Sequence, residues 1–143
     1  SFCYQLESVI PGQPLARRIH GSAGIVTLLR QRETFQFRAP PKFRYYVWHD
    51  RAVFHFLVNE ISAKTYLNTM RAALVPGGFF VLATFGPEGP DRCSGLEVQR
   101  YSIEALTELL DEDFTLKSFE IEEHTTPTGN VQQFLYSCWQ MTG

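Results

Sequence analysis

The sequence predicts an α/β domain, in which parallel strands form a sheet with flanking helices. Phe79–Ala83 is an unbroken apolar run, which is typical of a strand buried on both faces of a parallel sheet. The segment before it places five apolar side chains on one helical face: Tyr66, Leu67, Met70, Ala73 and Leu74. The chain has 143 residues and is 44% apolar, which is enough for one hydrophobic core, so we expect residues 1–143 to form a single domain.

The first 42 residues are less regular than the rest, and prolines and a glycine interrupt residues 11–14. Ile25–Leu29 is rich in β-branched residues, and Thr34–Phe37 follows it after a short polar connection. We expect these two segments to form a hairpin. It should end before Pro40, because proline cannot donate to a strand ladder.

The pattern from residue 44 onward alternates between strand and helix. Tyr45–Trp48 is a short apolar run that predicts a strand. Asp50 is expected to cap a helix over Ala52–Leu57, since an acidic side chain there accepts from free backbone donors. Asn59 or Ser62 is expected to cap the next helix, which the Pro-Gly-Gly turn ends.

The C-terminal part begins with a polar loop over residues 85–101, and a loop of this length is often functional. Ser102 is expected to cap a short helix. Two strands follow, Phe114–Glu123 and Phe134–Trp139, and the alternation of the first slips near Ser118, as in a β-bulge. The order of elements predicts a right-handed parallel crossover, followed by a C-terminal antiparallel hairpin at or near one edge of the sheet.

Charge and composition exclude several classes of protein. Residues 1–51 hold eight Lys/Arg and three Asp/Glu, a net charge of +5, whereas residues 52–143 carry a net charge of −7. The basic residues are scattered singly, so we expect no nucleic-acid partner. No apolar run is long enough to cross a membrane, and the broken N-terminal sequence predicts no signal peptide.

The three cysteines, Cys3, Cys93 and Cys138, are widely spaced and form no Cys-x-x-Cys pair. This arrangement predicts neither a disulfide framework nor a zinc site. Three free thiols fit a reducing compartment, so we expect a cytoplasmic protein. His124 stands beside two glutamates, but adjacent strand residues point to opposite faces, and we expect no metal.

Two longer stretches carry a family resemblance. Residues 46–57 read YVWHDRAVFHFL, and residues 71–85 read RAALVPGGFFVLATF. They resemble the C-terminal half of class I, S-adenosylmethionine-dependent methyltransferases, and the short stretches at 92–96 and 124–127 resemble small bacterial members. The resemblance covers residues 43–139 and implies a partial Rossmann-like sheet of methyltransferase type.

The N-terminal part departs from the pattern of that family. Its members begin with a strand and a glycine-rich turn, and an acidic residue then holds the ribose hydroxyls of the cofactor. Here only Gly21–Gly24 is glycine-rich, a strand-like segment follows it, and Tyr46 stands where the family often has an acidic residue. The resemblance therefore implies a truncated methyltransferase in which the cofactor-binding motif is absent and residues 1–42 are atypical.

The candidate site residues lie at predicted strand ends and in loops, because ligands of α/β sheets bind at the carboxyl ends of strands. If S-adenosylmethionine binds, the resemblance places four residues beside it: Trp48, His49, Asp50 and Arg51. It places four others beside the substrate: Thr84, Phe85, Arg92 and His124. Catalytic residues stay unknown, because methyl transfer depends on alignment more than on a strong base.

Several of these residues have a simpler interpretation. Asp50 is explained slightly better as an N-cap, and His49 is explained equally well as a surface histidine. Arg92 lies in a loop that is explained equally well as a mobile polar segment at the surface. His55, between two phenylalanines, is expected to be a satisfied core histidine.

Two functions stay open at this stage. The first is a shortened methyltransferase for a small-molecule substrate, with weak or no methyl transfer as a lone chain and a cofactor site completed across a homodimer. The second is a non-catalytic α/β binding module. Its exposed strand edge would be covered by residues 25–37, by a second copy or by a partner chain.

Overall fold

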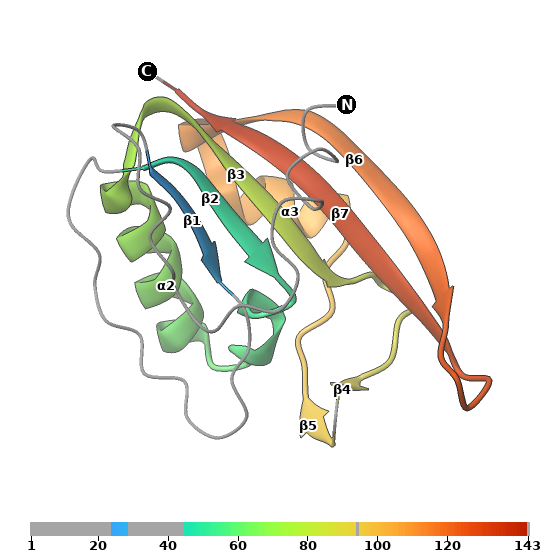
Figure 1. Ribbon diagram of the computed structural model, residues 1–143. Helices are drawn as coiled ribbons and strands as arrows, with labels where there is room; N and C mark the ends of the chain where they lie inside the picture. Colours follow the sequence, from blue (N-terminus) through green and yellow to red (C-terminus); the bar gives the residue numbers. More distant parts are fainter. Residues whose placement is uncertain (1–23, 29–44, 94, 143) are drawn as a thin grey trace.

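The computed structural model describes residues 24–28, 45–93 and 95–142. Five strands form one mixed sheet in the order β1-β2-β3-β7-β6. They are β1 (Gly24–Leu28), β2 (Tyr45–Arg51), β3 (Leu74–Phe85), β6 (Phe114–Thr125) and β7 (Val131–Met141). β1, β2 and β3 are parallel, whereas β7 runs antiparallel to β3 and β6 (Figure 1). The predicted α/β class, the parallel crossover and the C-terminal hairpin are confirmed.

Two helices pack on one face of this sheet, α2 (Glu60–Ala73) between β2 and β3, and α3 (Ile103–Leu110) before β6. The predicted apolar face of α2 is buried, with Tyr66, Leu67 and Met70 at most 2% exposed. We call the sheet face under α2 and α3 the helix face. Its buried sheet residues include Trp48, Phe80, Leu82, Leu135 and Trp139.

The other sheet face, here called the opposite face, carries a smaller buried cluster of Val47, Val81 and Cys138. Register pairs assign further residues to the two faces. Asp50 pairs with Leu82 on the helix face, whereas His49 pairs with Val81 on the opposite face. Residues next to each other along β2 therefore face different surroundings.

The expected helix over Ala52–Leu57 is wrong. The chain forms only a single 3₁₀ turn there, η1 (Phe54–Phe56). Ala52 has a φ of 57°, which an α-helix does not allow, and its N–H donates to the carbonyl of Ala83 on β3 at 3.0 Å. Ala52 is thus held by the sheet in a conformation that no α-helix contains, so the expected helix cannot include it.

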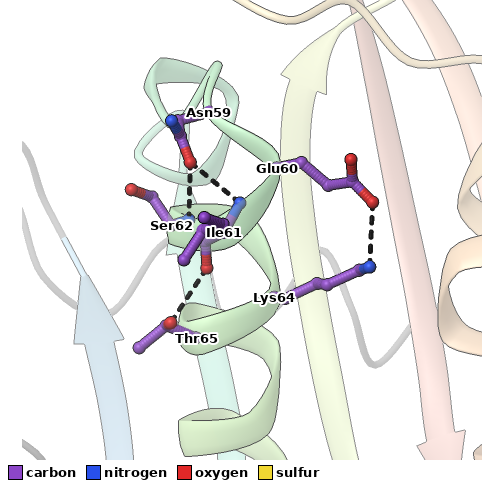
Figure 2. A network of polar contacts seen from close by, with 6 residues as sticks. All are labelled: Asn59, Glu60, Ile61, Ser62, Lys64 and Thr65. Carbon is purple, nitrogen blue, oxygen red and sulfur yellow. Dashed lines mark hydrogen bonds and ion pairs between the residues drawn. The ribbon is translucent and has the colours of Figure 1, made fainter.

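The N-terminus of α2 is capped by Asn59, one of the two predicted caps. Its side-chain oxygen accepts from the N–H groups of Ile61 at 2.8 Å and Ser62 at 3.3 Å (Figure 2). The ammonium of Lys64 lies 2.8 Å from the carboxylate of Glu60 one turn away, an exposed pair of small energetic value. At α3 the predicted cap is also confirmed, because Ser102 accepts from the N–H of Ala105 at 3.1 Å.

The C-terminal hairpin places β6 at the edge of the sheet, next to β7. The pairing of β6 with β7 shifts register between Leu116 and Ser118, which confirms the predicted bulge. The polar loop over residues 85–101 is not without structure, because β4 (Arg92–Cys93) and β5 (Leu96–Glu97) form a two-stranded ribbon within it.

The N-terminal strand prediction is confirmed over the described residues, and its partner is now known. β1 pairs in parallel with β2, so it covers the edge that β2 would otherwise expose. The second strand of the expected hairpin, Thr34–Phe37, lies outside the described residues, and the hairpin stays a prediction.

The cysteines correct one expectation. Cys93 is free, whereas Cys138 takes part in a disulfide bond. The prediction of three free thiols is therefore wrong, because spacing along the chain does not determine which cysteines meet in the fold. The cytoplasmic location rested on those thiols and stays a prediction. Within the described residues, no helix has the length and apolar character needed to span a membrane.

Candidate functional site

The carboxyl ends of the three parallel strands meet at one edge of the sheet, beside η1 (Figure 1). The loop after β3 is attached to this edge at both ends. The N–H of Phe85 donates to Nδ1 of His55 at 3.1 Å, and the N–H of Gln99 donates to the His55 carbonyl at 2.7 Å. Tyr101 returns to the strand end through a 3.1 Å bond to the Phe85 carbonyl. His55 is fully buried, as expected of a core histidine.

Asp50 is the centre of a buried hydrogen-bond network on the helix face. Its carboxylate is fully buried and accepts from the N–H of Val53 at 2.8 Å and of Phe54 at 3.0 Å. The hydroxyl of Tyr66 on α2 also donates to it, and Trp48 Nε1 donates to that hydroxyl at 2.9 Å. The expected N-cap role of Asp50 is wrong as stated, because the helix it was to cap is absent and Val53 is the N-cap residue of η1. Asp50 still accepts from the free backbone donors after β2, and both carboxylate oxygens are engaged inside the protein.

Burial determines the protonation of this network. It raises the pKa of Asp50 to about 7, although the hydrogen bonds from Tyr66, Val53 and Phe54 oppose the shift. Burial and the neighbouring Asp50 charge also raise the pKa of Tyr66 well above its usual range. Tyr66 therefore remains a donor at every physiological pH.

His49 and Arg51 lie on the opposite face of β2. His49 is only 3% exposed, so the surface-histidine interpretation is wrong. Burial and, to a smaller extent, the positive charge of Arg51 lower the pKa of His49 to about 4. Arg51 itself is exposed at the carboxyl end of the strand, and its guanidinium makes no hydrogen bond or ion pair within the described residues.

Thr84 and Phe85 are both fully buried at the end of β3. The hydroxyl of Thr84 has no hydrogen-bond partner within the described residues. The Phe85 ring lies between two other rings, with centroid distances of 4.8 Å to His55 and 5.0 Å to Phe134. The pair thus closes the carboxyl end of β3 with apolar packing.

Arg92 and His124 lie away from the other candidates. Arg92 is exposed on β4, and its guanidinium donates to the Gly95 carbonyl at 3.3 Å. His124 is exposed near the tip of the β6–β7 hairpin, where it pairs with Gln132. The structure brings together the candidates of β2 and β3 but leaves these two apart from them.

Sequence reasoning did not identify Tyr66 as part of the site, because a tyrosine on an apolar helix face is first read as core. The available signal was the phenolic hydroxyl itself, since a buried hydroxyl needs a partner. Asp50 stands sixteen residues earlier in the chain. Only the packing of α2 on β2 makes that pair visible.

Comparison with known proteins shows the fold. No protein-family model matches the chain, and no curated protein matches it. Among solved structures, an S-adenosylmethionine-dependent methyltransferase from Methanosarcina mazei aligns at 14% identity with a TM-score of 0.57, over 74% of this chain and 63% of its own. A second S-adenosylmethionine-dependent methyltransferase, from Mesorhizobium loti, aligns at 16% identity with a TM-score of 0.54, over 77% of this chain and 68% of its own.

A third solved structure is 1,6-didemethyltoxoflavin-N1-methyltransferase from Burkholderia thailandensis, which has 1,6-didemethyltoxoflavin and S-adenosylhomocysteine bound. It aligns at 22% identity with a TM-score of 0.56, over 73% of this chain and 47% of its own. The chain therefore has a partial class I methyltransferase fold, and it spans about half to two thirds of the length of these three structures.

The described residues fit S-adenosylmethionine only in part. Arg51 offers an exposed guanidinium at a strand end, which suits the carboxylate of the methionine moiety. Ribose hydroxyls are commonly held by an acidic side chain. Strands β1 and β2 contain one acidic residue, Asp50, and both of its carboxylate oxygens already accept hydrogen bonds inside the protein. Within the described residues, these strands therefore offer no free carboxylate for the ribose.

Proposed function

We propose that this chain forms the acceptor-binding part of an S-adenosylmethionine-dependent methyltransferase that acts on a small molecule. The observation that carries the proposal is the carboxyl edge of β2 and β3. There η1 and both ends of the loop after β3 are joined by hydrogen bonds at His55, in a fold shared with methyltransferases. Ligands of α/β sheets bind at this edge.

In this proposal the residues of the chain bind and orient rather than exchange protons. When bound, the cofactor supplies an electrophilic methyl group. Arg51 holds the cofactor carboxylate, and Phe85 excludes water from the strand end. His49 is neutral at pH 7 and buried, so it does not act as a cation there.

We expect cofactor binding by the chain alone to be weak, because Asp50 is not available to the ribose. A homodimer or a partner chain would then complete the site. The described sheet ends in β1 and β6, and either edge offers backbone groups for such pairing. Methyl transfer by the isolated chain should accordingly be weak or absent.

Calorimetry and thermal melting with S-adenosylhomocysteine test the proposal. We expect a dissociation constant on the order of 1 mM, corresponding to about −4 kcal/mol. Arg51→Gln should weaken binding at least several-fold, whereas Lys117→Gln, at the bulge of β6, should leave it unchanged. No heat and no melting shift at millimolar ligand would exclude cofactor binding by this chain.

A non-catalytic α/β binding module is the second candidate. The engagement of Asp50 within the protein favours it, since the strand end then serves the fold rather than a cofactor. The same calorimetry separates the candidates, because a binding module predicts no response to S-adenosylhomocysteine with or without Arg51.

A further inference from the structure

A cavity of about 530 Å³ lies between the loop after β3 and the first turn of α3. This volume is within the range of small-molecule sites. Pro87, Val98 and Ala105 supply apolar parts of its wall, and Ser102 contributes from the cap of α3. The loop that forms it begins at the carboxyl end of β3, the edge at which α/β sheets bind ligands.

Four charged side chains line this cavity, two cationic and two anionic: Arg92, Arg100, Asp91 and Glu97. Arg92 and Glu97 stand directly opposite each other in the β4–β5 ribbon, a separation at which opposite charges commonly pair. Within the described residues, however, ion pairs join Lys64 with Glu60 and Arg71 with Asp113, and none involves a charge of the cavity.

The two arginines keep most of their donors for a ligand. Arg92 donates to the Gly95 carbonyl and Arg100 to the Gly89 carbonyl, each through one nitrogen at 3.3 Å. A guanidinium carries five donors, so each arginine can still bind a carboxylate. Asp91 and Glu97 similarly retain carboxylate oxygens that can accept from an ammonium group.

Within the described residues these charges of both signs form no ion pair, and a cavity that carries both signs matches a ligand that carries both. We propose that this cavity binds a small zwitterion, a molecule with a carboxylate and a protonated amine joined by a short apolar chain. Arg92 and Arg100 bind its carboxylate, and Asp91 and Glu97 bind its ammonium group. That the zwitterion is the methyl acceptor rests on the proposed function, whereas its binding to the cavity does not.

Three probes with the same carbon skeleton test the assignment: β-alanine, propionate and propylamine. Each is titrated into the isotope-labelled chain, and amide shifts of residues 87–105 are followed by NMR. We expect β-alanine to bind about tenfold more tightly than either singly charged probe, since it uses both sets of charges. Equal binding of all three probes, or no shifts at tens of millimolar, would overturn the assignment.

Charge-neutralising variants separate the two sets of contacts. Arg100→Gln should weaken the binding of β-alanine and propionate but not that of propylamine. Glu97→Gln should weaken the binding of β-alanine and propylamine but not that of propionate. Lys117→Gln is the matched control and should change none of them. All three side chains are exposed, so well-dispersed spectra should show that the variants fold.

The same samples distinguish failure of this inference from failure of the proposed function. If β-alanine binds and S-adenosylhomocysteine does not, the zwitterion site holds and the methyltransferase proposal fails. If S-adenosylhomocysteine binds and β-alanine does not, the zwitterion site is refuted while the methyltransferase proposal stands.

Discussion

Adjacent residues on the two faces of β2 have pKa values shifted in opposite directions. On the helix face, Asp50 is buried but receives three donors, and its pKa rises to about 7. On the opposite face, the next residue back, His49, is buried beside the charge of Arg51, and its pKa falls to about 4. In both cases burial disfavours the charged form, whatever its sign.

The difference between the faces lies in what surrounds each group. The helix face joins the strand to α2 through Tyr66, so Asp50 serves the fold. The opposite face ends in the exposed guanidinium of Arg51, which makes no hydrogen bond or ion pair within the described residues and which our proposal assigns to the cofactor carboxylate. Strand alternation thus places neighbouring polar residues in different surroundings, where one is held by contacts inside the protein and another is exposed.

The largest expected effect comes from removing the carboxylate of the helix face. Asp50→Leu leaves two buried N–H groups and the Tyr66 hydroxyl without an acceptor, so we expect a loss of about 3–5 kcal/mol in the free energy of unfolding. Urea denaturation measures it. The exposed Asp91→Asn is the matched control and should change stability by less than about 0.5 kcal/mol.

The pH dependence of stability should separate the two faces. The folded pKa of Asp50, about 7, exceeds its unfolded value, so its contribution is full below pH about 4 and is lost as pH rises to about 7. The folded pKa of His49, about 4, lies below its unfolded value, so its contribution is full above pH about 6.5 and is lost as pH falls.

These two dependences largely offset each other in the natural chain. Asp50→Asn should therefore unmask a stability that rises between pH about 4 and 6.5, by at most about 3 kcal/mol. His49→Gln should unmask the opposite slope, a fall of at most about 4 kcal/mol between pH about 4 and 7. Denaturation at a series of pH values measures both, and parallel curves for the two variants would contradict the assignment.

A smaller effect is expected from the hydroxyl that connects the helix face to α2. Tyr66→Phe removes the donor to Asp50 and the acceptor for Trp48 while keeping the ring, so we expect a loss of about 2 kcal/mol. The pH at which Asp50 titrates should also rise, since one donor to its carboxylate is lost. Tyr101→Phe, on a partly exposed ring stacked on Phe54, is the control.

The smallest expected effect is a gain in stability. The Thr84 hydroxyl is buried and has no hydrogen-bond partner among the described residues, so Thr84→Val should raise the free energy of unfolding by about 1 kcal/mol. Thermal melting measures it. A loss of similar size would mean that the hydroxyl has an acceptor in solution.

Much of the fold could be predicted because its signals are local. The apolar face of α2, the caps at Asn59 and Ser102, and the slip near Ser118 each depend on a few consecutive side chains. The helix expected after Asp50 failed for a reason that no local pattern contains. The sheet holds Ala52 in a left-handed conformation through Ala83, a residue of another strand.

The candidate site could be predicted only as a location. Strand ends indicated where Asp50, Arg51 and Phe85 would gather, because parallel strands share a carboxyl edge. Whether Asp50 binds a ligand or supports the fold depends on Tyr66, and the charges at the cavity depend on how β4 and β5 pair. Such roles arise from contacts between segments that are separate along the chain.

The sequence by itself determined the α/β class, the order of most elements and the strand ends that form the carboxyl edge, because hydrophobic periodicity and capping act over short stretches. The tertiary structure decided which side of β2 each polar residue faces, which of them is buried, and which keeps its charge. Those properties depend on desolvation and on partners brought by other elements, and neither is encoded near the residue itself.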